Sequence, residues 1–375
     1  MKINGIQMSL MIGPAVPIPV GREVLDALQE IQVTAQTSGV SAFQLSFKLS
    51  PRSPLHTLFL FSSGTSIPLV RVVILITLAG ITHVIMDGVM TNHEVSSSNV
   101  GQATLTVTGE DLSRVMDYID FTGTPYPAMP PFTRIYTMLA KYAAFGVIPL
   151  AVPSVMMDVP IPVNRIPRQR GTDLSYIRQL ANEVGYVFYV EPGPVPLTST
   201  AYWGPEIRIS APQKALNADM DALSNVDNIN MSYNTEQASM PILFIYNEET
   251  HVAIPVPLPS NNPLSPPLGL VPPIPKRFEF ISETARLSLA QAAMIGLAKA
   301  SKDADAVSAS GTLDVIRYGG LLKARRLVGL RGAGTAFDGL YFVRSVTHKI
   351  KRGEYKQDFT LIRNGLISTL PRVPV

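Results

Sequence analysis

The side chains that could do chemistry are scattered along the 375-residue chain, and none forms a recognised catalytic pattern. No two histidines stand at the i, i+2 or i, i+4 spacing typical of metal ligands. The histidines are His56, His83, His93, His251 and His348. His93 and Glu94 lack a second histidine at zincin spacing, and His348 stands in a predicted strand, which favours a structural role.

A glycine-rich stretch and a few grouped carboxylates also do not match a known phosphate-binding or catalytic motif. Residues 329–334 (GLRGAG) resemble a phosphate loop, but no Walker lysine follows and no helix opens after them, so we interpret them as a turn. Nothing marks a carboxylate pair for acid–base work. The grouped aspartates are Asp117 and Asp120, near a helix end, and Asp219, Asp221 and Asp227, in a polar loop. The sequence therefore predicts a protein that is not an enzyme and holds no metal or cofactor.

Cysteine is absent, which excludes disulfides, thiol catalysis and cysteine-ligated metals. Charged residues make up only 16% of the chain and hydrophobic residues 46%. This composition excludes global disorder, because enough apolar surface exists to build a core. It also indicates that part of the surface is hidden against other subunits. The length predicts two to four domains.

Charge is unevenly distributed although the net charge is only +3. Residues 311–375 hold 12 Lys and Arg against 4 Asp and Glu. Solvated basic strand faces are the simpler interpretation, and a surface that meets an acidic partner is the alternative. A single tryptophan and no interleaving of basic with aromatic residues argue against specific nucleic-acid binding.

Neither the N-terminal apolar run nor the most apolar internal stretch predicts a membrane segment. Prolines and a glycine break the N-terminal apolar run, so it is not a signal peptide. The most apolar stretch, residues 69–86, contains Arg71 and His83 and is split by Gly80. Its pieces are far shorter than the ~20 residues of a spanning helix. Their β-branched content predicts a buried strand instead.

The first part of the chain has the pattern of a β unit. Apolar and polar residues alternate over 43–49 and 103–108, which predicts strands with one wet face. Residues 23–35 are expected to be a short helix or an edge element, and Asp87-Gly88 and Ala79-Gly80 are expected turns. We predict a first β-barrel over residues 1–114, and a short helix from 111 to 119 follows its strands.

An α+β domain is expected over residues 115–225. Residues 133–146 are helix-like, and Thr172 is a candidate N-cap for a second helix with one apolar face. Gly185 is expected to end that helix. A strand should then follow at 186–190.

The rest of the chain predicts a second barrel with an insertion. Residues 226–245 and 311–375 are assigned to the second β-barrel, and residues 246–310 to a Pro-rich loop and helical insertion. Nine prolines between 255 and 275 predict a surface loop or linker, or a docking segment for a neighbouring subunit. An Ala-rich helix from 282 to 301 is expected to cover a sheet. Residues 341–350 and 355–362 form the clearest hairpin, with its turn at Arg352-Gly353.

The two β regions share an order of landmarks, which suggests an internal duplication. Each has an arginine before a strand (Arg71, Arg326), then a glycine, then an Asp-Gly pair, then a further glycine. Nine residues are predicted to define the barrels or their interfaces. They are Asp87, Gly88, Asp338, Gly339, Tyr341, Val346, His348, Tyr355 and Phe359.

Four segments, in order, resemble the phage late control D family of baseplate hubs in contractile tails, which is similar to the hub half of VgrG-type spikes. The most extensive are residues 171–190 (GTDLSYIRQLANEVGYVFYV) and 337–350 (FDGLYFVRSVTHKI) followed by 353–365 (GEYKQDFTLIRNG). Residues 107–113 (VTGEDLS) resemble the end of the first barrel, and 282–311 the Ala-rich helix and the entry to the last barrel.

The resemblance implies a mainly β fold with α+β insertions, in which two tail-tube-like barrels are separated by helical and α+β subdomains. It implies a homotrimer whose six similar barrels adapt a hexameric tail-tube protein to a trimeric spike, in contact with other baseplate proteins. The particle would be a virion or an injection particle, with synthesis in the bacterial host cytoplasm. Many relatives continue into a spike or a lysozyme, so a separate spike protein is expected. A distal-tail or tail-tube ring component and a tail-associated cell-wall hydrolase are the alternatives.

Overall fold

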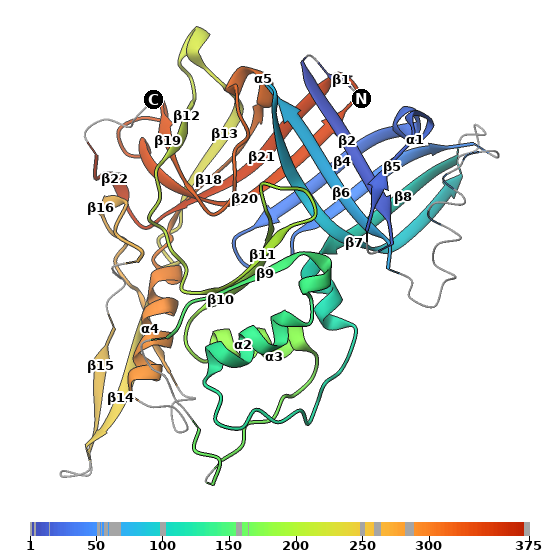
Figure 1. Ribbon diagram of the computed structural model, residues 1–375. Coiled ribbons are helices and arrows are strands. Elements are labelled where there is room, and N and C mark those ends of the chain that lie inside the picture. The colour runs from blue at the N-terminus through green and yellow to red at the C-terminus, as the bar shows by residue number, and fades with distance from the viewer. Residues whose placement is uncertain are drawn as a thin grey trace.

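The computed structural model places most strands in one large upper sheet and the longer helices below it (Figure 1). The structure describes residues 2–50 except 4 and 15, the single positions 53, 55 and 59, and residues 69–97, 103–154, 160–247 except 164, 252–258, 264–281 and 289–370. The prediction of a mainly β chain with α+β insertions is confirmed. All structural statements below concern these described residues.

The first β unit is built from six paired strands and short flanking elements. In space the six lie in the order β2-β6-β7-β8-β5-β4, each antiparallel to its neighbour. The elements are β1 (Lys2–Ile3), β2 (Ile6–Gly13), β3 (Ile18–Pro19), α1 (Arg22–Ala27), β4 (Leu28–Gln36), β5 (Ala42–Leu49), β6 (Arg71–Leu78), β7 (Ile81–Ser97) and β8 (Ala103–Asp111).

The second β unit repeats this topology. Its strands lie in the order β12-β19-β20-β21-β18-β13, so the first, fourth, fifth, sixth, third and second strands along the chain follow one another in both units. The one difference is that β12 pairs with β19 in parallel. The elements are β12 (Gln213–Asn217), η5 (Asp221–Leu223), β13 (Val226–Tyr233), β18 (Val307–Asp314), α5 (Val315–Tyr318), β19 (Leu327–Arg331), β20 (Gly339–Lys351) and β21 (Glu354–Arg363).

The two units are joined through their backbones. Strand β4 of the first unit pairs with residues 345–351 of β20 in the second, which makes the sheet continuous. One hydrophobic core also runs through both units, from Leu45 and Phe47 to Tyr355 and Leu361. The two expected barrels are therefore joined by hydrogen bonds and a shared core.

An α+β domain lies beneath the first unit. Strands β10, β11 and β9 form its sheet, and α2 and α3 pack on that sheet around the buried Trp203. The elements are η3 (Leu112–Asp117), α2 (Pro131–Ala140), η4 (Ala143–Phe145), β9 (Val147–Ala151), α3 (Asp173–Asn182), β10 (Val187–Pro192) and β11 (Ser199–Gly204).

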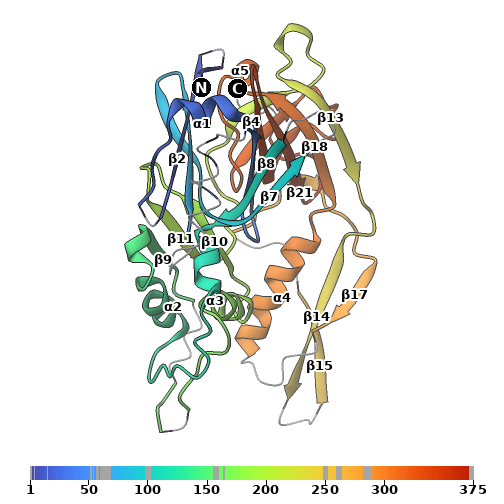
Figure 2. The same cartoon turned by 90° about the vertical axis from the view of Figure 1, so that its right-hand side faces the viewer.

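A second insertion, which we call the arm, lies between β13 and β18. It is a three-stranded sheet in the order β15-β14-β17 with one long helix, α4, against it. The elements are β14 (Ser239–Asn247), β15 (Val252–Pro257), β17 (Arg277–Phe280) and α4 (Leu289–Asp303). Between β15 and β17 the chain forms β16 (Gly269–Val271), which pairs with β22 (Leu366–Ser368). Figure 2 shows the arm beneath β13, with α4 on the arm's inner side.

Several local predictions are confirmed. The Thr172 hydroxyl caps α3 by accepting from the Ser175 amide at 3.2 Å, and Gly185 adopts a left-handed conformation (φ +68°) after the helix. The C-terminal hairpin is present as β20 and β21. Helix α4 covers the β14 sheet, and residues 282–288 of its predicted span lie outside the described residues.

Other predictions were wrong for identifiable reasons. Over residues 23–35 the expected short helix is present only as α1, up to Ala27, and residues 28–36 form the interior strand β4, because Leu28, Ile31 and Val33 are buried in the shared core. The Pro-rich segment contains strands β15 and β16, and Pro255 and Pro257 are tolerated because β15 is an edge strand. Asp87-Gly88 is no turn, since β7 runs through it.

The structure also places three strands across the expected boundaries. Strand β14 belongs to the arm, whereas residues 226–245 were assigned to the second barrel. Strand β18 begins at Val307, inside the expected insertion, and β12 pairs with β19 although it falls within residues 115–225. In the part of the chain that is described, no helix is long and apolar enough to cross a membrane.

Replacement of Val346 by aspartate tests the C-terminal strand. Val346 is fully buried and lies opposite Phe359 and Ala35, so a carboxylate there has no partner. We expect Val346→Asp to lower the free energy of unfolding by several kcal/mol or to give insoluble protein. The matched control, Ser345→Asp, puts the same charge on the polar face of the strand and should fold. Equal urea-unfolding curves for the two variants would contradict the strand assignment.

Candidate assembly interface

The junction between the two β units is the antiparallel pairing of β4 with β20. Ala35, Val33 and Ile31 of β4 lie opposite Val346, His348 and Ile350 of β20. On the other face of the sheet the Thr34 and Thr347 hydroxyls hydrogen-bond at 3.0 Å. The junction therefore combines backbone hydrogen bonds, an apolar side and a polar side.

Two of the longer strand segments have no such partner on one side among the described residues. Strand β13 pairs only with β18. In β7, residues 92–97 pair with β8, but residues 70–78 cover the other side of β7 only up to Met90, whose amide donates to the Val70 carbonyl at 2.8 Å. Open edges of this length are templates for pairing with another chain.

Strand β13 has the place in the second unit that β4 has in the first, and β7 has the place in the first unit that β20 has in the second. The long strands carry a bulge at the same place, Thr91 in β7 and Arg344 in β20. Aligning these bulges makes Val95 the equivalent of His348 and His93 that of Val346.

The other half of the junction aligns in the same way. Followed strand by strand from the bulge, the pairings make Met231 of β13 the equivalent of Val33. The same alignment superposes a second bulge, at Gln29 in β4, on one at Asp227 in β13. The coincidence of two bulges supports the alignment independently of side-chain identity.

Apolar side chains at the two open edges are only partly buried. Ile229, Met231 and Tyr233 of β13 lie on the core side of the sheet and are half-buried. Val95 also lies on the core side, opposite Leu105, yet its side chain is 46% exposed. Both edges thus expose apolar area that a strand partner would cover.

Part of the basic C-terminal segment is paired within the chain. Lys351 pairs with Glu30 of β4 at 3.6 Å, Lys349 with Asp358 at 2.5 Å, and Lys356 with Asp227 of β13 at 3.3 Å. The polar face of the sheet is otherwise lined by short hydroxyl and amide side chains, as around Asn228, Ser310 and Thr360. This favours the solvated-face interpretation of the charge imbalance.

Asp87 links the first β unit to the α+β domain. Arg71 donates to both Asp87 carboxylate oxygens at 2.7 Å, from Nε and Nη2, and both side chains are buried. Ser199, at the start of β11, donates to the same carboxylate at 3.3 Å. Gly88 beside it is required because a Cβ there would lie 2.2 Å from the Glu110 carbonyl oxygen. These two predicted residues form a buried link, not a turn.

Asp338 and Gly339 lie where the chain enters β20 from the preceding turn. The Asp338 carboxylate accepts from the Ala333 amide at 2.7 Å, and Gly339 has a φ of +139°. Arg363 donates to the Asp338 carbonyl at 2.9 Å, and its guanidinium lies 4.6 Å from the Tyr341 ring centre. Phe359 lies over Gly311 of the neighbouring strand, as Phe43 does over Gly109 in the first unit.

His348 is the centre of a buried hydrogen-bonded cluster. Its Nδ1 and the Tyr355 hydroxyl hydrogen-bond at 2.7 Å, and the Gln357 side chain bonds both the amide and the carbonyl of Leu322. Burial lowers the pKa of His348 to about 4 and raises that of Tyr355. The imidazole is therefore neutral at physiological pH, which fits a structural role.

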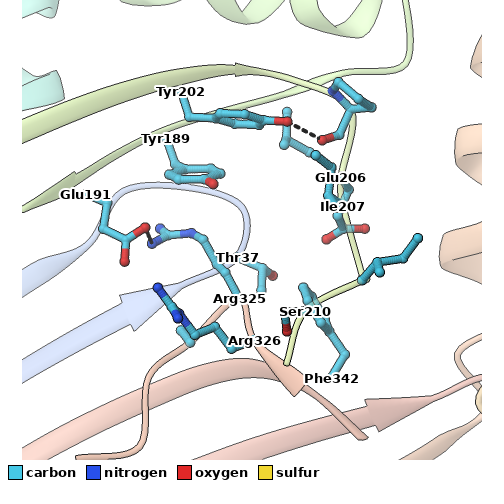
Figure 3. Close-up of a pocket in the computed structure, with 14 residues that line it drawn as sticks. Thr37, Tyr189, Glu191, Tyr202, Glu206, Ile207, Ser210, Arg325, Arg326 and Phe342 are labelled. Carbon is cyan, nitrogen blue, oxygen red and sulfur yellow. Dashed lines mark hydrogen bonds and ion pairs between the residues drawn. The ribbon is translucent and has the colours of Figure 1, made fainter. Parts of the chain in front are cut away.

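A cavity of about 330 Å³ lies where the second β unit meets the α+β domain (Figure 3). The Arg325 guanidinium lies 3.9 Å from the Tyr189 ring centre and 3.7 Å from Glu191, and Tyr189 stacks on Tyr202 at 5.0 Å. Burial raises the pKa of Tyr189 to about 12 and lowers that of Arg325. The phenol thus stays protonated at neutral pH, and the group joins the two bodies by cation–π contact.

Sequence reasoning missed the residues of the open edges. The alternation of Ile229, Met231 and Tyr233 with Asn230 and Ser232 was a visible strand signal, but nothing in it shows that the strand is last in its sheet. Arg71 and Asp87 were each singled out, although their pairing depends on the register of β6 on β7. Within the described residues, no three acidic or histidine side chains are grouped to hold a metal ion.

Solved structures share this fold across nearly the whole chain. A tail protein from Neisseria meningitidis MC58 is 14% identical, with a TM-score of 0.63 over 97% of this chain and 98% of that one. The 43 kDa tail protein of prophage MuSo2 from Shewanella oneidensis is also 14% identical, with a TM-score of 0.63 over 96% and 98%. The Escherichia coli c3393 protein, a type VI secretion component similar to T4 tail proteins gp27 and gp5, is 14% identical with a TM-score of 0.55 over 100% and 80%.

These likenesses are structural. No protein-family model matches the sequence, and no curated protein is similar to it in sequence. The chain thus has the fold of phage tail proteins and of a type VI secretion component, as its resemblance to baseplate hubs implied.

Replacement of Asp87 by asparagine tests the buried link. The Arg71 charge would remain buried without its counter-ion, so we expect the free energy of unfolding to fall by about 3–5 kcal/mol. Glu236→Gln, which breaks the exposed Lys276–Glu236 pair, is the matched control and should leave stability unchanged. Urea unfolding of both variants measures the difference. Similar stabilities for the two would show that the Asp87 link contributes little.

The buried histidine makes stability depend on pH. The unfolded chain protonates His348 near pH 6.5, whereas the folded chain does so only near pH 4. The free energy of unfolding should therefore fall as the pH drops through this window, by up to about 3 kcal/mol. His348→Gln removes this titrating group, so the difference in the free energy of unfolding between wild type and variant should change between pH 7.5 and pH 4. Parallel pH profiles would contradict the assignment.

Proposed function

We propose that the chain is the structural hub of a contractile tail or injection particle. Three copies would form a ring of six β units that joins a hexameric tail tube to a trimeric spike, in contact with other baseplate proteins. The fold supports the tail role, and the resemblance of residues 171–190 and 337–365 to baseplate hubs supports the hub role. The particle would be a virion or an injection particle.

The observation that carries this proposal is the match between the junction and the open edges. Because β13 is equivalent to β4 and β7 to β20, a second copy can repeat between chains the contact that β4 and β20 make within one. In that register Met231 lies opposite Val95 of the next copy, and Tyr233 lies opposite its His93. Repetition would close the sheet into a ring in which the open edges of β13 and β7 are both paired.

The nine predicted residues act in this proposal as framework, not as contact residues. Tyr341, Val346, Tyr355 and Phe359 are buried and hold the curvature of the second unit. His348 and Val346 line the internal junction, and Asp87 fixes the α+β domain beneath the first unit. Function would then follow from geometry and strand register and need no catalytic step.

A cysteine pair tests the ring contact directly, because the chain has no cysteine of its own. We expect Met231→Cys combined with Val95→Cys to form disulfides between chains under mild oxidation, since directly opposed strand residues have Cβ atoms within reach of an S–S bond. Denaturing electrophoresis without reductant should show a covalent trimer.

The matched control shifts one cysteine by a single residue. Ser232→Cys with Val95→Cys places the two thiols on opposite faces of the sheet and should stay unlinked. Equal cross-linking of both pairs, or a ladder that ends at six chains, would contradict the proposed register or the trimer. A ladder of six would favour a tube or distal-tail ring.

A further inference from the structure

The arm has an apolar face that the described part of the chain leaves uncovered. Helix α4 covers one face of the arm sheet, where Leu243 and Leu258 are buried. On the opposite face Phe244, Phe278 and Phe280 are 41%, 60% and 61% exposed. The rings of Phe244 and Phe280 stack at 5.3 Å. We call these three residues the aromatic face. Clustered exposed aromatic side chains of this kind mark a docking surface.

The inner side of the arm is already occupied by the chain's own α+β domain. Helix α4 approaches Gly185 so closely that a Cβ there would lie 2.9 Å from the Met294 carbonyl oxygen and from the Ala298 methyl group. On the other side of α4, Gly296 packs against Leu258 of the arm sheet. Helix α4 thus lies between the α+β domain and the arm sheet (Figures 1 and 2). The strand register puts the aromatic face on the side of the arm sheet that α4 does not cover.

The position of the arm follows from the strand that precedes it. The arm is inserted between β13 and β18, where the first unit has only the short segment 37–41 between β4 and β5. Its base follows Tyr233, the residue that would lie opposite His93 of the next copy. Val89, four residues before His93 on β7, belongs to the core of the α+β domain. Closing the ring therefore brings the arm next to the α+β domain of the next copy.

We propose that the aromatic face packs on the α+β domain of the neighbouring copy, an inference that rests on the proposed ring. The receiving patch is the end of η3, which packs beneath β7 and where Tyr118 and Ile119 are 50% and 58% exposed. Each arm then bridges two α+β domains, its own through α4 and the next one through the aromatic face. This contact would be a second tier below the β ring.

Photo-cross-linking of the assembled ring locates this contact. A benzophenone amino acid replaces Phe278, and unlabelled chains are mixed with ¹⁵N-labelled chains so that links between copies are distinguished by mass. We expect links between copies to fall within residues 112–204, clustered near Tyr118. The matched probe at Lys302, exposed on α4, should give no such cluster.

Three outcomes separate this inference from the proposed function. Links from position 278 to the α+β domain of another copy support it. A ring held by the Met231–Val95 disulfide in which position 278 links only within its own chain, or elsewhere on the neighbour, overturns the arm contact and leaves the ring intact. Failure to form any ring overturns both.

A double substitution gives an independent readout. Because Phe278 and Phe280 are exposed in the single chain, Phe278→Ser with Phe280→Ser should leave its unfolding curve unchanged. The concentration at which the ring dissociates, measured by light scattering, should rise at least tenfold. An unchanged dissociation curve would contradict the docking role of the aromatic face.

Discussion

The pairing of β4 with β20 is the interaction on which the rest of the structure depends. A strand at the end of a sheet exposes unpaired N–H and C=O groups, so each edge needs a partner or a protection. Within the chain that need is met once, at residues 30–36 and 345–351, and it converts two similar units into one sheet with one core. The same unit duplicated necessarily presents the same two edges again, on β13 and β7. In the proposed ring, assembly would repeat this internal contact between chains.

The inserted domains are attached to this sheet by buried polar groups. Arg71, Asp87 and Ser199 join the first unit to the α+β domain, and Arg325 with Tyr189 joins the second unit to it. Arg208 holds the end of α4 through two hydrogen bonds to Asp305, at 2.6 and 2.8 Å. Buried ion pairs contribute little net stability, but losing one partner is costly, so they specify where each insertion sits.

Local sequence patterns predicted those elements well that have one side exposed to solvent. The strand at residues 43–49, the Thr172 cap and the C-terminal hairpin follow from alternation, a hydroxyl and a turn. Residues 28–36 were misjudged because their apolar spacing fits both helix and strand, and only pairing with β20 decides. Asp87-Gly88 has the composition of a turn, yet the buried ion pair between Asp87 and Arg71 of the neighbouring strand fits an extended backbone there. Which strands lie at an edge depends on long-range order, which no local pattern records.

The mass of the purified protein in solution, measured by light scattering, tests the central claim most directly. Closure of the β13 and β7 edges through three chains predicts a particle of three times the 40.7 kDa chain mass, which persists on dilution until the ring dissociates. A stable particle of six chains, or a single chain that remains monomeric at high concentration and in the presence of its spike, would contradict closure by strand pairing.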